Sequence, residues 1–454
     1  MCNECIDSTL KKLRDGARNV ANLARADRLG VTGRRILWNV LIPITQELEQ
    51  NTTARKLILR KSGICKVGAN LISRALQMNV TLLELSLEGN NIGDAGASAL
   101  AIGIGKNVTL RKLSVEKNKI GDTGAIALGR ALAENRAMRF VSFQKNLVSD
   151  YGAIRLVKSL ETNQLAGLDL TYNNVADRGA AALGRALKRN ESLLFLGLYT
   201  NNIGDEGAEG LARGLEVNSS LKRLHLTQNV VGSEGAKALA TMLEKNSTLE
   251  ILDLYRNRIG DEGARAISRA LESNTTASIA CNTLVEINLK FNKLGPRCAE
   301  PLAEALAKTD KFESLDLEQN NFGDQGVTTL AQSICRNDSL IFLNLDHNYI
   351  GDTGIAALAQ ALRKNDSLHE LLLMGNNFGD EGEHALLAAV RVNESLIKIK
   401  PVLDDIRTAM EPNCKIVNLK RDIAYMLDTL PEVVASVVPL LASFLFSQDL
   451  LLAA

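Results

Sequence analysis

The residue types that most often do chemistry are few in this chain and lie far apart. The histidines are His225, His347, His369 and His384, and the seven cysteines are Cys2, Cys5, Cys65, Cys281, Cys298, Cys335 and Cys414. Cys2 and Cys5 have the spacing of a redox pair or of half a zinc site, but no second Cys or His pair nearby completes a metal site. No Ser or Cys lies in a recognisable nucleophile motif. We therefore predict no catalytic centre, no metal and no cofactor, and expect that the chain is not an enzyme.

A recurring aspartate could be taken for a calcium-binding or acid/base array. It is found at Asp94, Asp122, Asp150, Asp177, Asp205, Asp261, Asp324, Asp352 and Asp380. Each copy precedes apolar residues at helical spacing, and aspartate is among the residues preferred at helix starts. We interpret these aspartates as helix caps.

Ten Asn-x-Ser/Thr sequences could indicate glycosylation. They begin at Asn51, Asn79, Asn107, Asn190, Asn218, Asn246, Asn274, Asn337, Asn365 and Asn393. Nearly all occur at one phase of a repeat, between an expected helix and an expected strand, where Asn can end a helix and adopt a left-handed turn. We interpret them as part of the repeat structure.

That repeat is marked by an asparagine preceded by apolar residues, mostly Leu, at minus eight, minus five and minus three. Its copies are Asn90, Asn118, Asn146, Asn173, Asn201, Asn229, Asn257, Asn292, Asn320, Asn348 and Asn376, and the usual spacing is 28 residues. Residues 249–254 alternate apolar and polar residues, which predicts a short strand with one buried face. An inward amide at Asn257 can bond the backbone groups that the following turn leaves unpaired, so we predict an asparagine ladder.

After each turn, residues such as 259–271 have apolar positions at helical spacing. One strand and one helix cannot bury both apolar faces alone, so the units must stack, with strands inside the curve and helices outside. We predict an N-terminal helical cap over residues 1–53, about twelve 28-residue units over 54–400, and a C-terminal capping segment over 401–454. Residues 275–281 are expected to form an inserted loop. The apolar run 433–446 is shorter than the ~20 residues that cross a bilayer, so a capping helix is favoured over a membrane anchor.

The stretch from Leu193 to Leu221, with Leu-x-x-Leu-x-Leu-x-x-Asn-Asn-Ile-Gly-Asp-Glu-Gly-Ala, resembles the ribonuclease-inhibitor type of leucine-rich repeat. The resemblance covers about residues 54–400. It implies an α/β leucine-rich-repeat solenoid, a horseshoe with a concave parallel sheet, convex outer helices and helical caps at both ends. Similar repeats occur in ribonuclease inhibitors, NOD-like receptors and the activator of the GTPase Ran.

The chain departs from each of these relatives. Residues 1–53 contain no Gly-rich phosphate loop, unlike a NOD-like receptor, and the array has one repeat type and few cysteines, unlike ribonuclease inhibitors. Ran activators end in an acidic tract that is missing here, although Arg60 or Arg74 could supply charge to a phosphate. We keep GTPase activation of a Ran-like protein as the alternative function.

On each strand, the residues between and just after the buried leucines are expected to face the concave side. The middle repeats concentrate aromatic and charged residues there, and Tyr and Arg often dominate interface energies. The predicted partner-binding residues are Tyr172, Tyr199, His225, Asp253, Tyr255, Arg256, Lys290 and Phe291, with Asp169 in the same rows. Acidic flanks at Glu88, Glu116, Asp316, Glu318 and Asp346 could steer a basic partner. The alternative is a solvated inner face with aromatic residues scattered by chance.

The overall charge favours no nucleic acid or acidic membrane as a partner. Lys and Arg number 53 and Asp and Glu 52, which leaves a formal net charge of +1. The N-terminal residues lack an apolar signal sequence and the cysteine count is odd, so we expect a cytoplasmic or nuclear location. The sequence therefore predicts a protein-binding scaffold or regulator, with a protein partner that can be a small GTPase, without stable membrane insertion. A cytosolic sensor of a microbial or small ligand has no sequence feature of its own.

Overall fold

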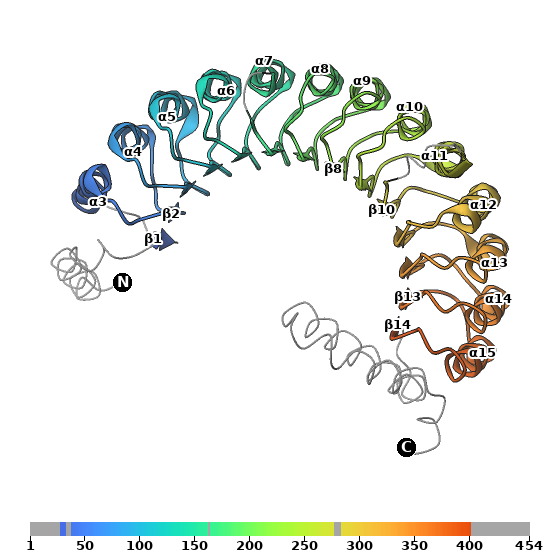
Figure 1. The fold of residues 1–454 in the computed structure, drawn as a ribbon. Helices are drawn as coiled ribbons and strands as arrows, with labels where there is room; N and C mark the ends of the chain where they lie inside the picture. Colours follow the sequence, from blue (N-terminus) through green and yellow to red (C-terminus); the bar gives the residue numbers. More distant parts are fainter. Residues whose placement is uncertain (1–27, 33–37, 162–163, 277–282, 401–454) are drawn as a thin grey trace, which may run out of the picture.

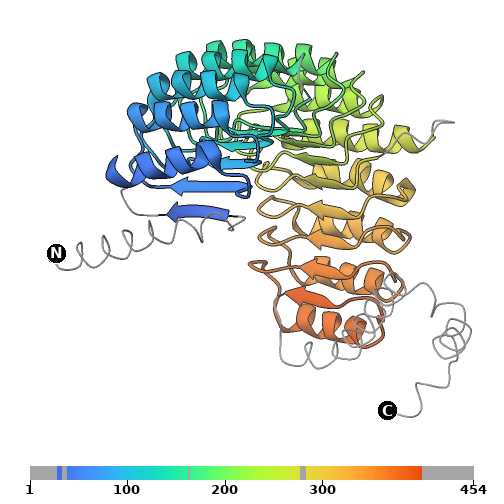
Figure 2. The same ribbon diagram turned by 60° about the vertical axis from the view of Figure 1, so that its left-hand side comes forward.

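A single curved sheet runs through the computed structural model, which describes residues 28–32, 38–161, 164–276 and 283–400. Fourteen strands pair in parallel and in chain order, and the helices cover the outer side of the curve (Figure 1, Figure 2). The chain therefore forms the leucine-rich-repeat horseshoe expected from the spacing.

The strands are β1 (Arg28–Thr32), β2 (Lys56–Arg60), β3 (Glu84–Ser86), β4 (Lys112–Ser114), β5 (Phe140–Ser142), β6 (Gly167–Asp169), β7 (Phe195–Gly197), β8 (Arg223–His225), β9 (Ile251–Asp253), β10 (Glu286–Asn288), β11 (Ser314–Asp316), β12 (Phe342–Asn344), β13 (Glu370–Leu372) and β14 (Lys398–Lys400). The helices are α3 (Trp38–Gln50), α4 (Lys66–Met78), α5 (Gly93–Lys106), α6 (Asp122–Glu134), α7 (Asp150–Leu160), α8 (Asp177–Leu187), α9 (Asp205–Leu215), α10 (Ser233–Leu243), α11 (Gly260–Thr276), α12 (Ala299–Lys308), α13 (Gly323–Ile334), α14 (Asp352–Leu362) and α15 (Asp380–Val390). A 3-10 turn, η1 (Pro296–Cys298), precedes α12.

The core lies between the sheet and the outer helices. In β7 and β8, Leu196 pairs in register with Leu224, and both side chains are fully buried. Leu211 of α9 is fully buried against the same layer. Each unit is too thin to enclose such side chains alone, so neighbouring units supply the rest of the core.

The ladder asparagines point inward and bond across the unit boundary. The Nδ2 of Asn229 donates to the carbonyl oxygens of Leu198 and Leu226, each at 2.9 Å, and its Oδ1 accepts from the Ile203 N–H at 3.0 Å. Every ladder asparagine donates in the same way to a carbonyl of the preceding unit. These amides satisfy backbone groups that the turns leave without ladder partners.

A second asparagine ladder, which the sequence analysis missed, occupies the Asn-x-Ser/Thr phase. The Nδ2 of Asn107 donates to the carbonyl oxygens of Leu76 and Asn79, both at 2.8 Å, and its Oδ1 accepts from the Leu110 N–H at 2.7 Å. The prediction that these asparagines adopt a left-handed turn is wrong, because φ is negative, at −76° for Asn79 and −75° for Asn107. The extended backbone turns the amide inward, where it is buried and already bonded.

Seven of the nine recurring aspartates cap the next unit's helix rather than their own, and Asp261 bonds the N–H of Gly295 in the next unit. The Oδ1 of Asp94, on the first turn of α5, accepts from the N–H groups of Gly121 and Gly124 at the start of α6, at 2.7 and 2.9 Å. Asp122, Asp150, Asp177, Asp205, Asp324 and Asp352 bond the following helix in the same pattern. Each of these aspartates therefore ties two units together as well as capping a helix.

The sheet begins before residue 54, where a helical cap was expected to end. Strand β1 pairs in parallel with β2, with Arg28 beside Lys56, and α3 packs on α4, so residues 28–32 and 38–50 continue the strand and helix pattern. The sequence analysis expected an inserted loop over residues 275–281. Residues 275 and 276 belong instead to α11, which ends at Thr276. The Cys2 and Cys5 pair and the segment 401–454, with its apolar run, lie outside the described residues.

Candidate binding surface

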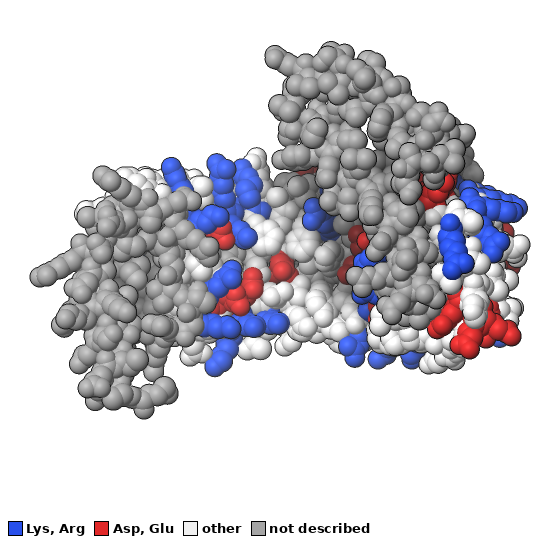
Figure 3. Space-filling view, turned by 90° about the horizontal axis from the view of Figure 1, so that it is seen from below, with Lys and Arg blue, Asp and Glu red and all other residues white. Residues whose placement is uncertain are grey.

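The inner face of the sheet has four positions in each unit, at six, four, two and one residues before the ladder asparagine, or before Ser62 in the unit of β2. We call these positions the concave rows. The residue one before the asparagine adopts a left-handed backbone in each unit, as at Lys145, Tyr172 and Arg256, with φ of 55°, 54° and 54°. This conformation turns its side chain beside the neighbouring unit's row. Figure 3, which looks into the hollow of the curve, shows charged side chains towards the N-terminal side and many uncharged ones in the middle.

Tyr172 and Tyr199 form the centre of the aromatic surface. Their hydroxyl oxygens are 3.1 Å apart in a hydrogen bond, their ring centroids are 4.9 Å apart, and Lys145 Nζ lies 4.7 Å from the centroid of Tyr172. The shared hydrogen bond lowers the pKa of Tyr172 and raises the pKa of Tyr199. The two half-buried rings are thus held together before any partner arrives.

A second aromatic group lies in the rows nearer the start of the strands. The ring of His225 meets the edge of Phe195 at 5.2 Å between centroids, and Phe195 stacks on Phe140 at 6.3 Å. Lys112 Nζ lies 5.6 Å from the Phe140 centroid. Phe140 and Phe195 were not among the predicted binding residues, although both occupy the position six before a ladder asparagine, which could have identified them.

The third aromatic group joins four of the predicted residues. Tyr255 and Phe291 contact edge to face at 5.5 Å, and Lys290 Nζ lies 5.4 and 5.8 Å from their respective centroids. Asp253 accepts the Tyr255 N–H at 3.0 Å, so it positions the backbone beneath that ring. Arg256 is exposed and forms no ion pair within the described part of the chain.

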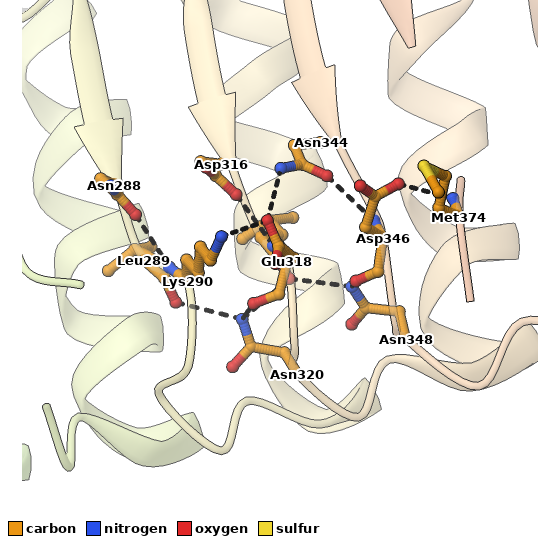
Figure 4. A network of polar contacts seen from close by, with 11 residues as sticks. Asn288, Leu289, Lys290, Asp316, Glu318, Asn320, Asn344, Asp346, Asn348 and Met374 are labelled. Carbon is orange, nitrogen blue, oxygen red and sulfur yellow. Dashed lines mark hydrogen bonds and ion pairs between the residues drawn. The ribbon is translucent and has the colours of Figure 1, made fainter. Parts of the chain in front are cut away.

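Carboxylates gather on the rows of β11 and β12 (Figure 4). Asp316 accepts the Glu318 N–H at 3.0 Å, and the Glu318 carboxylate pairs with Lys290 and accepts from Asn344 Nδ2 at 3.2 Å. Asp346 accepts the Met374 N–H at 2.5 Å. Burial raises the pKa of Asp316 and of Asp346, because desolvation disfavours their charged forms.

The arginines considered for GTPase activation do not converge. Arg60 Nε donates to Ser86 Oγ at 2.9 Å and lies 3.4 Å from Glu88, so its charge is already engaged. Arg74 is on α4, on the opposite, convex side. Across residues 28–32, 38–161, 164–276 and 283–400, no group of three or more His, Cys, Asp or Glu could hold a metal ion. Within the same ranges, no helix has the length and apolar character needed to cross a bilayer.

Two family models agree with this fold. A "Leucine Rich repeat" model matches residues 79–101, 106–129, 168–184, 189–212, 217–240 and 245–268, and a "TMOD/LMOD Leucine-rich domain" model matches residues 280–408. One solved structure with similarity is leiomodin-1 actin-binding site 2, with 21% identity over 36% of this chain and 95% of that chain, and a TM-score of 0.31. No curated protein matches the chain.

These matches leave the finer assignments open. The ribonuclease-inhibitor type of repeat stays a prediction, and nothing in the matches supports GTPase activation. With the parallel sheet, the outer helices and both family models in agreement, the chain belongs to the leucine-rich-repeat proteins.

Proposed function

We propose that the chain is a non-enzymatic scaffold or regulator that binds a partner protein on the concave face of its repeat array. The observation that supports this most is the set of three aromatic groups on β5 to β10, around Tyr172, Phe195 and Tyr255. Aromatic rings that are already packed on one another lose little conformational entropy when a partner covers them. Lysines beside the rings add polar contacts around an apolar centre.

The middle of the concave face has the composition of a protein interface. Aromatic residues and arginine are enriched at the centres of such interfaces, with polar residues at the rim. Here Tyr199 lies two units before Tyr255 and Arg256, with the unit of β8 between them, and charged rows flank them on both sides. A chance scatter of solvated side chains would not require the ring contacts and the shared tyrosine hydrogen bond.

The test compares two triple variants in affinity purification from native cells. The binding variant carries Tyr199→Ala, Tyr255→Ala and Arg256→Ala. The matched control carries Tyr151→Ala, Tyr349→Ala and Arg178→Ala, which removes the same residue types from the outer helices and the rim, where Tyr151 and Tyr349 are 55% and 64% exposed. Loss of a partner from the binding variant alone is expected. Retention of every partner by the binding variant would remove the concave face as the site.

A further inference from the structure

The concave rows change sign along the array, and this bears on the partner that the proposed function requires. The N-terminal block, the rows of β2 to β5, has six cations against three carboxylates. These are Lys56, Arg60, Lys61, Lys112, Lys117 and Lys145 against Glu84, Glu88 and Glu116. The central block, the rows of β6 to β9, is balanced, with Arg223 and Arg256 against Asp169 and Asp253.

The C-terminal block, the rows of β10 to β13, is acidic. Its one lysine, Lys290, stands against Glu286, Asp316, Glu318, Asp346 and Glu370. On β14, Lys398 pairs with Glu370 at 2.5 Å, at the far edge of this block. The aromatic groups therefore lie between a basic end and an acidic end.

Ion pairs within each block do not remove the imbalance. In the N-terminal block, Glu84 lies between Lys56 and Lys112, at 3.7 and 3.8 Å, and Arg60 pairs with Glu88. Lys61, Lys117 and Lys145 remain exposed.

In the C-terminal block, Lys290 pairs with Glu318. Asp316 and Asp346 form no ion pair within 4.0 Å in the described ranges, and both accept backbone N–H groups instead. Each end therefore keeps an excess charge that a partner can meet.

The two ends are too far apart to act as one site. Eight strand steps separate the middles of the blocks, which at ~4.8 Å per step is about 40 Å along the sheet. Salt screens charges beyond about 8 Å at physiological ionic strength. Each block therefore interacts only with the part of a partner that lies directly against it. Opposite charges favour a match at each end, and like charges oppose a partner that binds the other way round.

We propose that the partner of the concave face binds in one orientation, with a basic segment against the C-terminal block, an apolar or aromatic centre against the tyrosines, and an acidic segment against the N-terminal block. This inference rests on the proposed function and adds the polarity of the partner. The aromatic groups supply affinity without direction. The two charged blocks supply direction.

The probe is a synthetic peptide with four Glu at one end, four Lys at the other and an uncharged spacer that contains Trp and Leu. A spacer of about twelve residues can span the distance between the blocks when extended. A photoreactive group is placed at either the Lys end or the Glu end, and cross-links to the full-length protein are mapped by mass spectrometry. We expect the Lys end to label the units of β10 to β13 and the Glu end to label those of β2 to β5.

Binding of the same peptide, followed by fluorescence anisotropy, tests the charges directly. Asp316→Asn with Asp346→Asn keeps the acceptor oxygens that hold the backbone, and should weaken binding about three- to tenfold at low salt and less at high salt. The control Glu300→Gln with Glu304→Gln, both exposed on α12, should leave binding unchanged.

The possible failures separate the two proposals. Equal labelling of both blocks from each end, with binding still lost when Tyr199 and Tyr255 become Ala, would overturn the orientation and keep the concave site. Reversed labelling would also overturn it. Failure of the peptide to bind, or binding that does not depend on the two tyrosines, would overturn the orientation. If native partners also stay bound when the tyrosines are changed, the proposed function falls as well.

Discussion

Ser233 stands where most units have an aspartate, and Gly260 at the start of the next unit's helix adopts a φ of 61°. Where the preceding unit carries the aspartate, the residue equivalent to Gly260 has an extended backbone and its N–H donates to that aspartate. Gly232, with a φ of −100°, donates to Asp205 in this way at 2.7 Å. Gly93 and Gly323 repeat the left-handed conformation, with φ of 60° and 55°, and they follow units that carry Lys66 and Pro296 at the aspartate position. The side chain of one unit thus decides the backbone conformation at the start of the next.

Gly260→Ala should destabilise the array by about 1 kcal/mol, because an alanine is strained at a left-handed φ. A Cβ at Gly260 would meet no atom within 4 Å, so the strain is purely of the backbone. Gly379→Ala is the matched control, since Gly379 is equally open but has a φ of −115°. Urea unfolding of both variants should show a loss only for Gly260→Ala, and equal losses would refute the link.

Asn173→Ala should lower the free energy of unfolding by about 1–3 kcal/mol, because it leaves buried backbone groups without partners. The Asn173 side chain donates to the carbonyl oxygens of Phe143 and Leu170 at 3.0 Å and accepts from the Val148 N–H at 3.0 Å. The next residue, Asn174, is exposed, so Asn174→Ala is a control from the same turn. An equal effect of both changes in chemical denaturation would argue against the ladder's contribution.

Tyr199→Phe should raise the pKa of Tyr172, because the hydrogen bond between the two hydroxyl groups is the largest cause that lowers it. The wild-type pair should ionise in two steps, with Tyr172 first, since the same contact raises the pKa of Tyr199. Ultraviolet absorbance or NMR titration of the tyrosines measures both steps. An unchanged Tyr172 titration in the variant would mean that the two hydroxyl groups do not interact in solution.

Asp316→Asn should stabilise the protein at neutral pH and lose this advantage in acid. Burial raises the pKa of Asp316 in the folded state. The folded form therefore holds the proton more tightly than the unfolded chain, and its stability is fully present below the unfolded pKa and is lost as pH rises through the folded pKa. The difference in unfolding free energy between variant and wild type should be larger at pH 7 than near pH 3.5, whereas a pH-independent difference would contradict the burial effect.

The sequence predicted those features that repeat within one unit. Leu252 and Leu254 alternate as a strand requires, and the 28-residue spacing places Asn229 and Asn257 in line. Hydrogen bonds between units were harder to predict. Asp205 lies at the start of its own helix, where a capping residue is expected, yet it accepts a hydrogen bond from Gly232 of the next unit. Strand β1 pairs Leu29 with Leu57 and Val31 with Leu59, but no ladder asparagine follows it in the sequence, so its place in the sheet was not predicted.

In the candidate site, too, the features within one unit were predicted from the sequence and the contacts between units were not. Alternation along the strand placed Tyr199, Tyr255 and Lys290 on one face. The contacts between them depend on the left-handed residue before each ladder asparagine, which turns Tyr172 towards Tyr199 and Phe291 towards Tyr255. That conformation is set by bonds to the next unit and leaves little trace in residue type, since Lys, Tyr, Arg and Phe all occupy it.

Site-specific photo-cross-linking in native cells tests the central claim most directly. A photoreactive phenylalanine replaces Tyr199 on the concave face or, as the control, Tyr151 on α7. Binding on the concave face predicts a covalent partner adduct from position 199 and none from position 151. An adduct from position 151 with none from position 199 would contradict it.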